Sequence, residues 1–329
     1  MVVNPVALKC RYYDILDEQE ACTALARFSF DARCANTANS RYLSTGLLPL
    51  EGTIAGELFS GADAAITYGY GAHSYWAETD QYLLLALWAD ETDEEGLAAV
   101  TERLYRELIA QVSERGYPHL VRVWNYFADI NGEAEGLERY RQFCLGRFDA
   151  FAAADIAENQ YPSACALGHH GGDLLIYALA SKVAPRHFEN PRQSSAYRYP
   201  AEYGPRSPSF ARASLLSLPG QVPTLFVSGT ASVVGHETLH PYNLAEQISV
   251  TLENLDLLLA HVARQYPGDQ APRLQADILK VYVRNPADLA EIKRRVEQAY
   301  PQVPVVYVAA DICRADLLLE IDGIWNLLV

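Results

Sequence analysis

The chain has 329 residues, half of them apolar and a fifth charged, which is ordinary for a globular protein and long enough for two domains. Its 41 acidic and 26 basic residues give a net charge of −15, which argues against nucleic acid or an anionic membrane surface as a partner. No apolar run approaches the ~20 residues of a membrane-spanning helix. Residues 1–11 lack a basic stretch followed by an apolar stretch and a small-residue cleavage site, so we expect no signal peptide and a cytoplasmic protein.

Strands and helices alternate in the first half of the chain, as the spacing of its apolar residues indicates. In chain order we expect a strand at 82–88, a helix from the acidic segment 91–95 to about 115, a strand at 119–126, a helix at 136–153, and two strands at 163–168 and 173–180 that form a closing hairpin. The second half repeats this order. There we expect a strand at 224–228, a helix at 244–265, a strand at 276–284, a helix at 288–299, and strands at 303–308 and 317–321.

A β-α-β-α-β-β unit therefore occurs twice in tandem. We predict an α+β fold in which each copy has a mixed sheet with helices packed on one face. The hinge between the copies lies near 181–185, which divides the chain into an N-terminal domain, 1–183, and a C-terminal domain, 184–329, that carries the active site. Residues 185–219 are rich in Pro, Ser, Arg and Tyr and predict a long loop, which in a compact domain is usually functional.

Alignment of the two closing strands sets Tyr177 of the first copy against Glu320 of the second, which lies within an apolar run. If Glu320 is buried, desolvation raises its pKa and makes it a proton donor near neutral pH. Glu320 is therefore the candidate general acid. The alternative is that Glu320 lies on the solvent face of an edge strand, with its apolar neighbours directed inward.

Residues 225–240 join an apolar strand to a loop of small and polar residues, 228–232, whose amides and hydroxyls suit an anionic ligand. Residues 236–240 match the His-Glu-x-x-His pattern of zinc proteases, which requires a helix. Gly235 and Pro241 flank the pattern and disfavour a helix there. The cysteines lack Cys-x-x-Cys spacing and are expected to be reduced thiols: Cys10, Cys22, Cys34, Cys144, Cys165 and Cys313. We therefore predict no metal site.

Positive charge gathers in two places in this acidic chain. Residues 186–212 hold five arginines against two acidic residues, with Tyr199 and Tyr203 among them and Arg212 at the end. Arg139, Arg141 and Arg147 fall on the helix predicted at 136–153. Most of these arginines are expected to be solvated or to form salt bridges. Because guanidinium groups bind carboxylates through paired hydrogen bonds and aromatic rings stack on flat ligands, we expect two or three to converge on a small, flat dianion.

Segments 124–132, 139–147, 190–200, 203–212 and 226–236 resemble the chorismatases. The resemblance extends from about Leu120 to the C-terminus, and about the first 80 residues carry no motif that we can place. Several long motifs in one order are more specific than one short pattern. The family's fold resembles that of the small trimeric imine deaminases (RidA/YjgF-like), so its implied architecture is a duplicated unit of that kind with a degenerate N-terminal copy.

The resemblance implies an enzyme that cleaves the enolpyruvyl ether of chorismate and releases pyruvate without a metal or organic cofactor. In the family a glutamate on the last core strand is the proposed acid, and Glu320 matches it here. The residues expected to contact the substrate are Arg147, Tyr199, Tyr203, Arg212, Gly229, Thr230 and Ala231.

Products differ among chorismatases: a dihydroxycyclohexadiene carboxylate, 3-hydroxybenzoate, or a mixture of 3- and 4-hydroxybenzoate. Two positions are linked to this choice, and they hold Ala231 and Cys313 here. Alanine resembles the hydrolytic branch and cysteine the hydroxybenzoate branch. With the length of the chain, this mixed pair favours a hydroxybenzoate synthase that gives both isomers. A thiol can shuttle a proton as the ring aromatises, so Cys313 is a second catalytic candidate, and its alternative is a small buried hydrophobe.

Three other functions stay open. They are a chorismate hydrolase that gives 3,4-dihydroxycyclohexa-1,5-diene carboxylate, an imine or enamine deaminase, and a non-enzymatic protein that binds an aromatic acid. The segment 186–212 argues against the deaminase, because the small deaminases lack such a segment. The sequence leaves open whether the chain is a monomer or a trimer.

Overall fold

Two seven-stranded mixed sheets and a smaller N-terminal sheet form the framework of the computed structural model, which describes residues 8–14, 24–31, 36–38, 40–61, 65–90, 95–267 and 272–328. The first large sheet has the order β21-β12-β9-β13-β8-β7-β6. Its strands are β6 (Thr67–Tyr70), β7 (Ser74–Glu78), β8 (Tyr82–Ala89), β9 (His119–Ala128), β12 (Ser163–His169), β13 (Leu174–Ser181) and β21 (Asp311–Ile312). The helices α2 (Leu97–Glu114) and α3 (Arg139–Ala153) belong to this half.

The second large sheet has the order β14-β15-β16-β22-β19-β20-β4. Its strands are β4 (Leu48–Pro49), β14 (Arg186–Phe188), β15 (Ala213–Leu216), β16 (Thr224–Thr230), β19 (Arg273–Val283), β20 (Val305–Ala309) and β22 (Leu319–Leu328). The helices of this half are α4 (Leu244–Gln265) and α5 (Leu289–Ala299). The N-terminal sheet contains β1 (Lys9–Tyr13), β5 (Gly56–Ser60), β2 (Ala24–Ser29) and β3 (Tyr42–Ser44).

The predicted repeat is confirmed by the strand pairing. In the first copy β13 lies between β8 and β9, antiparallel to both, and β9 is parallel to β12. In the second copy β22 lies between β16 and β19, antiparallel to both, and β19 is parallel to β20. The elements β8-α2-β9-α3-β12-β13 therefore correspond one by one to β16-α4-β19-α5-β20-β22.

The closing hairpin predicted at 163–180 is wrong, because β9 lies between β12 and β13. All eight residues of β13 are buried, and a strand buried on both faces belongs in the middle of a sheet. Helix α3 begins at Arg139 rather than near 136, since the preceding residues form the short hairpin β10 (Glu133–Ala134) and β11 (Leu137–Glu138), with Glu135 and Gly136 at positive φ. Strand β22 continues to Leu328, beyond the predicted end at 321, through the polar Asp322 and Asn326.

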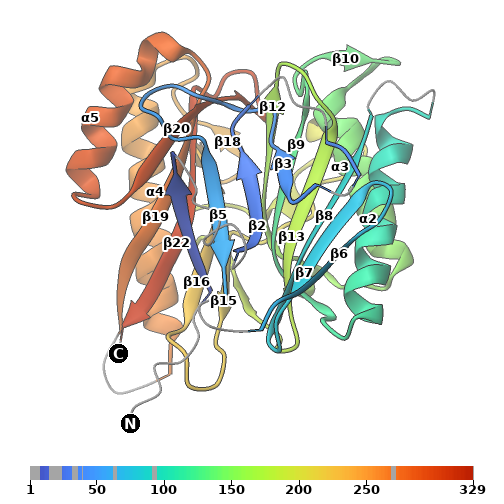
Figure 1. Ribbon diagram of the computed structural model, residues 1–329. Helices are drawn as coiled ribbons and strands as arrows, with labels where there is room; N and C mark the ends of the chain where they lie inside the picture. The colour runs from blue at the N-terminus through green and yellow to red at the C-terminus, as the bar shows by residue number, and fades with distance from the viewer. Residues whose placement is uncertain are drawn as a thin grey trace.

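The central strands β8 and β13 are buried along their whole length, so their side chains fill cores on both faces of the first sheet. The described part of the interior has three large apolar cores and one small one at Tyr13, Ala24 and Leu58. One core lies between the first sheet and α2 and α3, and a second lies between the other sheet and α4 and α5. Helix α4 places Ile248, Leu255, Leu258 and Val262 against its sheet, at the spacing of one helical face. Figure 1 shows α2 and α3 on one outer side of the molecule and α4 and α5 on the other, with β1, β2 and β5 between the sheets. Among the described residues, no helix is both long and apolar enough to span a membrane.

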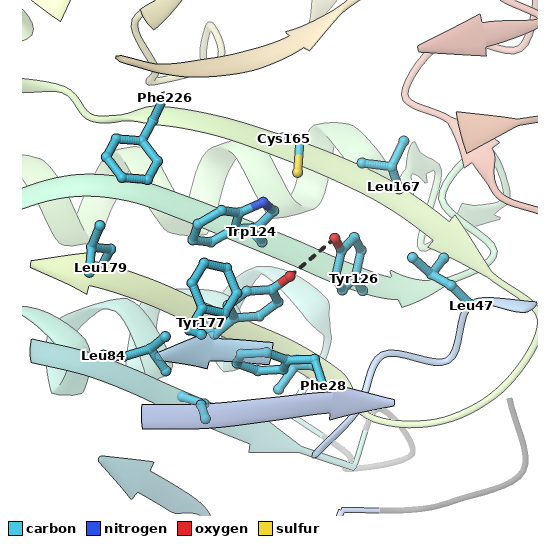
Figure 2. Close-up of a cluster of buried hydrophobic side chains, with 14 of the residues drawn as sticks. Phe28, Leu47, Leu84, Trp124, Tyr126, Cys165, Leu167, Tyr177, Leu179 and Phe226 are labelled. Carbon is cyan, nitrogen blue, oxygen red and sulfur yellow. Dashed lines mark hydrogen bonds between the residues drawn. The ribbon is translucent and has the colours of Figure 1, made fainter. Parts of the chain in front are cut away.

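The third core joins the inner faces of both large sheets to the N-terminal sheet. At its centre Tyr177 lies between two rings, with centroids 3.9 Å from Phe28 and 4.8 Å from Trp124. Figure 2 shows this stack together with Tyr126, whose hydroxyl lies 3.3 Å from that of Tyr177. The first part of the chain, for which the sequence predicted no motif, therefore covers the inner face of the first copy. Cys22 and Cys34 lie outside the described residues.

Candidate active site

A cavity of about 360 Å³ lies where the two copies meet. The first copy contributes α3 and β12, and the second contributes the end of β16, the segment 193–212 and the connection from β21 to β22. Strand β21 belongs to the second copy in sequence but pairs with β12 in the first sheet, as Leu167 faces Ile312. This crossing of the chain places residues 313–317 over the cavity.

Glu320 lines this cavity from β22, and its side chain is 4% exposed. The alternative of a solvent-facing edge strand is wrong, because β22 lies between β16 and β19. Burial and the nearby Asp322 raise the pKa of Glu320 to about 8, against the opposing effect of Arg122 and Arg212. A carboxyl with this pKa is largely protonated at neutral pH.

Gly229 makes room for the Glu320 carboxyl. The pairing of β16 with β22 shifts register between Val227 and Thr230, and a bulge of this kind redirects the chain beside a site. A Cβ atom at position 229 would lie 1.6 Å from Oε1 of Glu320 and 2.4 Å from Cδ, so the acid packs directly against the bare backbone. Thr230, the next residue, does not line the cavity, in contrast to the sequence prediction. Its hydroxyl donates to the carbonyl oxygen of Ser228 at 3.0 Å.

Three arginines line the cavity with nitrogen atoms that have no hydrogen-bond partner within the described chain. Arg147 of α3 is 1% exposed, and its Nε and Nη2 are buried and unpartnered. Arg212 donates from Nη2 to the Tyr199 hydroxyl at 2.7 Å, and its Nε is unpartnered. Nη2 of Arg314 is also buried and unpartnered. A buried donor without a partner is costly, so the arrangement fits a ligand with several acceptor oxygens.

Two tyrosines of the segment 186–212 form an aromatic wall. The rings of Tyr199 and Tyr203 are 5.4 Å apart, and the guanidinium carbon of Arg314 lies 5.3 Å and 4.4 Å from their centroids. The hydroxyl of Tyr203 lies 3.3 Å from Nδ1 of His236. The predicted convergence of arginines and tyrosines is therefore present, although of the five arginines at 186–212 the cavity is lined by Arg212.

Arg314 is the residue of this set that the sequence prediction missed. It lies outside both arginine-rich segments and follows Cys313, which the sequence does place in the pocket. Cys313 is half-buried, and burial together with Glu320 raises the pKa of its thiol to about 12. The thiol is therefore a neutral hydrogen-bond donor rather than a thiolate. Ala231 lines the cavity, and its carbonyl oxygen accepts a hydrogen bond from Asn254 at 3.0 Å.

The His-Glu-x-x-His segment does not form a helix. Its residues 236–240 lie around the hairpin β17 (Val233–Val234) and β18 (Glu237–Thr238), and His240 has a φ of 53°. Two histidines in this geometry do not share one helical face. Within the described ranges no group of three or more His, Cys, Asp and Glu side chains could hold a metal ion.

Comparison with known proteins identifies the family. The family model described as chorismatase FkbO/Hyg5-like, N-terminal, matches residues 57–180. A 3-hydroxybenzoate synthase of Streptomyces hygroscopicus is 41% identical over 239 residues, with 68% of each chain covered. A chorismatase of Streptomyces rapamycinicus is 40% identical over 255 residues, with 76% of each chain covered. The chain belongs to the chorismatase family.

A solved chorismatase structure agrees with this chorismatase along nearly its whole length. The two chains are 31% identical with a TM-score of 0.86, and the match covers 97% of this chain and 98% of the other. The predicted family resemblance is therefore confirmed. It also begins earlier than the sequence motifs indicated, since the family model starts at residue 57 rather than near 120.

Proposed function

We propose that this chorismatase cleaves the enolpyruvyl ether of chorismate and releases pyruvate together with 3-hydroxybenzoate, 4-hydroxybenzoate or both. The observation that carries the proposal is a buried carboxyl, Glu320, in a cavity that is also lined by the buried Arg147 and Arg212 and the half-buried Arg314. Burial raises the pKa of Glu320 to about 8, so it can serve as a proton donor near neutral pH. Chorismate has two carboxylates on a compact framework, and its enol ether needs protonation at carbon. The arginines would therefore bind the dianion, and Glu320 would donate the proton.

Glu320 acts first in this mechanism, by protonating the terminal methylene of the enol ether. The product is an oxocarbenium ion, and the Glu320 carboxylate that remains stabilises its positive charge. Attack by the ring hydroxyl or by water then relieves that charge, and the ether bond breaks. Arg147, Arg212 and Arg314 hold the carboxylates, so the methylene is presented to the acid in a fixed orientation.

The atom balance separates the two product classes. Chorismate has the same composition as pyruvate and hydroxybenzoate together, so this outcome consumes no water and changes no net oxidation state. Release of the dihydroxycyclohexadiene carboxylate with pyruvate consumes one water. Neither outcome needs an electron acceptor, and the reaction proposed here uses no cofactor.

Cys313 and Ala231 are proposed to face the ring of the substrate, and Cys313 is proposed to bias the product toward hydroxybenzoate. The neutral thiol of Cys313 can donate a hydrogen bond at the ring as it aromatises, whereas the methyl group of Ala231 excludes water. The relative named 3-hydroxybenzoate synthase, at 41% identity, supports this branch. We further propose that the enzyme is cytoplasmic. It would consist of an N-terminal domain at 1–183 and a C-terminal domain at 184–329, and the C-terminal domain supplies the general acid Glu320.

Incubation of the purified protein with chorismate tests the function. Pyruvate is measured by a coupled dehydrogenase assay, and the aromatic and diene products are separated by mass-resolved chromatography. Pyruvate with hydroxybenzoate supports the proposal, and pyruvate with the diene carboxylate identifies a hydrolase. Binding of chorismate without pyruvate release would indicate a sensor, and neither binding nor release would leave the deaminase as the remaining function.

A further inference from the structure

A buried ion pair links the two copies directly beside Glu320. Asp322 follows Glu320 by two residues on β22, so the two side chains lie on the same face of the strand. Asp322 is 3% exposed, and its Oδ2 accepts hydrogen bonds from Nη2 of Arg122 at 2.6 Å and from the hydroxyl of Tyr282 at 3.0 Å. Arg122 is 1% exposed and comes from β9 of the first copy.

The buried acidic side chains differ in whether they form an ion pair. Three acidic side chains are fully buried within the described part of the chain: Glu57, Glu320 and Asp322. Glu57 pairs with Lys280 at 2.7 Å and Asp322 pairs with Arg122 at 2.6 Å. Glu320 has no ion-pair partner within 4 Å in that part of the chain, although it lines the cavity. A buried carboxylate without a cation is unstable, so this arrangement favours the neutral form of Glu320 alone.

We propose that Asp322, held by Arg122 of the other copy, is a positioning residue for the reaction and keeps Glu320 available as a neutral proton donor. The inference rests on the proposed function, in which Glu320 is the acid. Asp322 is not among the residues that line the cavity. It acts through Glu320, because a fixed negative charge one strand repeat away disfavours a second one.

Other groups around Glu320 favour either its ionised form or its neutral form. Arg122 on β9 and Arg212 beside the cavity favour its ionised form, whereas burial and Asp322 oppose it. The thiols of Cys165 on β12 and Cys313 are near enough for their own titration to respond to Glu320. Arg122 thus has two effects: it fixes the Asp322 charge in the core, and it limits the effect of that charge on Glu320.

The extended hydrogen-bond network holds Asp322 in place. The hydroxyl of Tyr282 lies 2.9 Å from that of Tyr126, which also accepts from Lys280 at 3.3 Å. Tyr177, the counterpart of Glu320 in the first copy, donates to Glu57 at 2.6 Å. The network therefore spans both copies and the N-terminal sheet, and it ends at the residue next to the acid along one strand face.

The test is the Asp322→Asn variant, which keeps the shape of the side chain and removes its charge. The pKa of Glu320 should fall by about one unit or more, since one like charge is lost and Arg122 is no longer balanced. The basic limb of the kcat/KM profile should move to lower pH by the same amount, so activity should recover as the pH is lowered. A merely structural role would reduce activity equally at all pH values.

A direct readout separates this inference from the function itself. The Glu320 carboxyl can be titrated by carbon NMR, with its signal assigned by its loss in Glu320→Gln. The double variant Asp322→Asn with Arg122→Gln replaces the pair by neutral groups and should shift the pKa in the same direction by less, and it decides the matter if the single variant does not fold. An unchanged Glu320 titration in the folded variant overturns the inference. If the pKa of Glu320 shifts in Asp322→Asn but the wild-type protein releases no pyruvate from chorismate, the proposed function is overturned and the inference about Asp322 stands.

Discussion

Gly229→Ala should inactivate this chorismatase through Glu320 alone. The new Cβ would lie 1.6 Å from Oε1 of Glu320. Ordinary van der Waals contacts of a Cβ atom begin at about 3.4 Å, so the carboxyl must withdraw by about 2 Å. A misplacement of ~1 Å can cost ~10²-fold in rate, and kcat should therefore fall at least ~100-fold. Gly229 has no positive φ, so alanine is compatible with the backbone, and overpacking should cost about 1–3 kcal/mol of unfolding free energy.

The assay is pyruvate release from chorismate, with denaturant unfolding measured on the same samples. Gly171→Ala is the matched control, because Gly171 has no positive φ and a Cβ atom added there would meet no other atom within 4 Å. In a Glu320→Ala background the clashing atoms are gone, so Gly229→Ala should cost little stability there. Near-normal kcat in Gly229→Ala, or an equal loss of stability in both backgrounds, would refute this steric account.

Four further predictions concern the side chains of Glu320, Arg212 and Cys313. Glu320→Gln should lower kcat by ~10²–10⁴-fold, and near-normal turnover would show that Glu320 is not the general acid. Folded Glu320 keeps its proton up to a pKa of about 8, so the wild-type unfolding free energy should fall as pH rises from ~4.5 to 8, a slope that denaturant titrations of Glu320→Gln should lack. Arg212→Ala should lower kcat/KM more than tenfold, since one charge-assisted hydrogen bond is worth about 1.5–3 kcal/mol; an unchanged kcat/KM would exclude a substrate contact. Cys313→Ala should shift the products from hydroxybenzoates toward the diene carboxylate, as mass-resolved chromatography would show; an unchanged ratio means that Cys313 only packs.

Local apolar patterns were sufficient to predict the repeat. Helix α4 has the predicted bounds, because one face is apolar throughout and Asn243 caps its first turn by accepting from the backbone NH of Glu246. The order of the strands in each sheet was harder to predict from the sequence. The four residues between β12 and β13 resemble a hairpin turn, and only the pairing of β9 with both strands excludes it. That pairing depends on contacts distant in sequence, which periodicity does not encode.

The site was predicted in part, for a similar reason. Glu320, Arg147 and Arg212 stand out in the sequence because each has an unusual neighbourhood, an apolar strand or a basic segment. Arg314 has neither, and its place at the cavity follows from the pairing of β21 with β12 across the two copies. Asp322 could have been placed beside Glu320 from strand alternation alone, but its partner Arg122 could not.

The N-terminal sheet was beyond the reach of sequence patterns. Its strands are short, and their apolar side chains pack on the inner faces of sheets formed much later in the chain. The hydroxyl of Tyr12, for example, donates to the carbonyl oxygen of Leu279 at 2.6 Å. The position of these strands therefore depends on contacts with distant parts of the chain, which local sequence patterns do not encode.

Both copies of the repeat lie in one polypeptide, so a substitution alters one copy and leaves the other unchanged. In a homo-oligomer built from the same unit, every equivalent position would change at once. The consequence is visible at one pair of positions, where Tyr177 is sealed between two aromatic rings while Glu320 faces a cavity. In a tandem arrangement, substitutions that stabilise the core of one copy and substitutions that create a reactive site in the other copy can therefore occur independently.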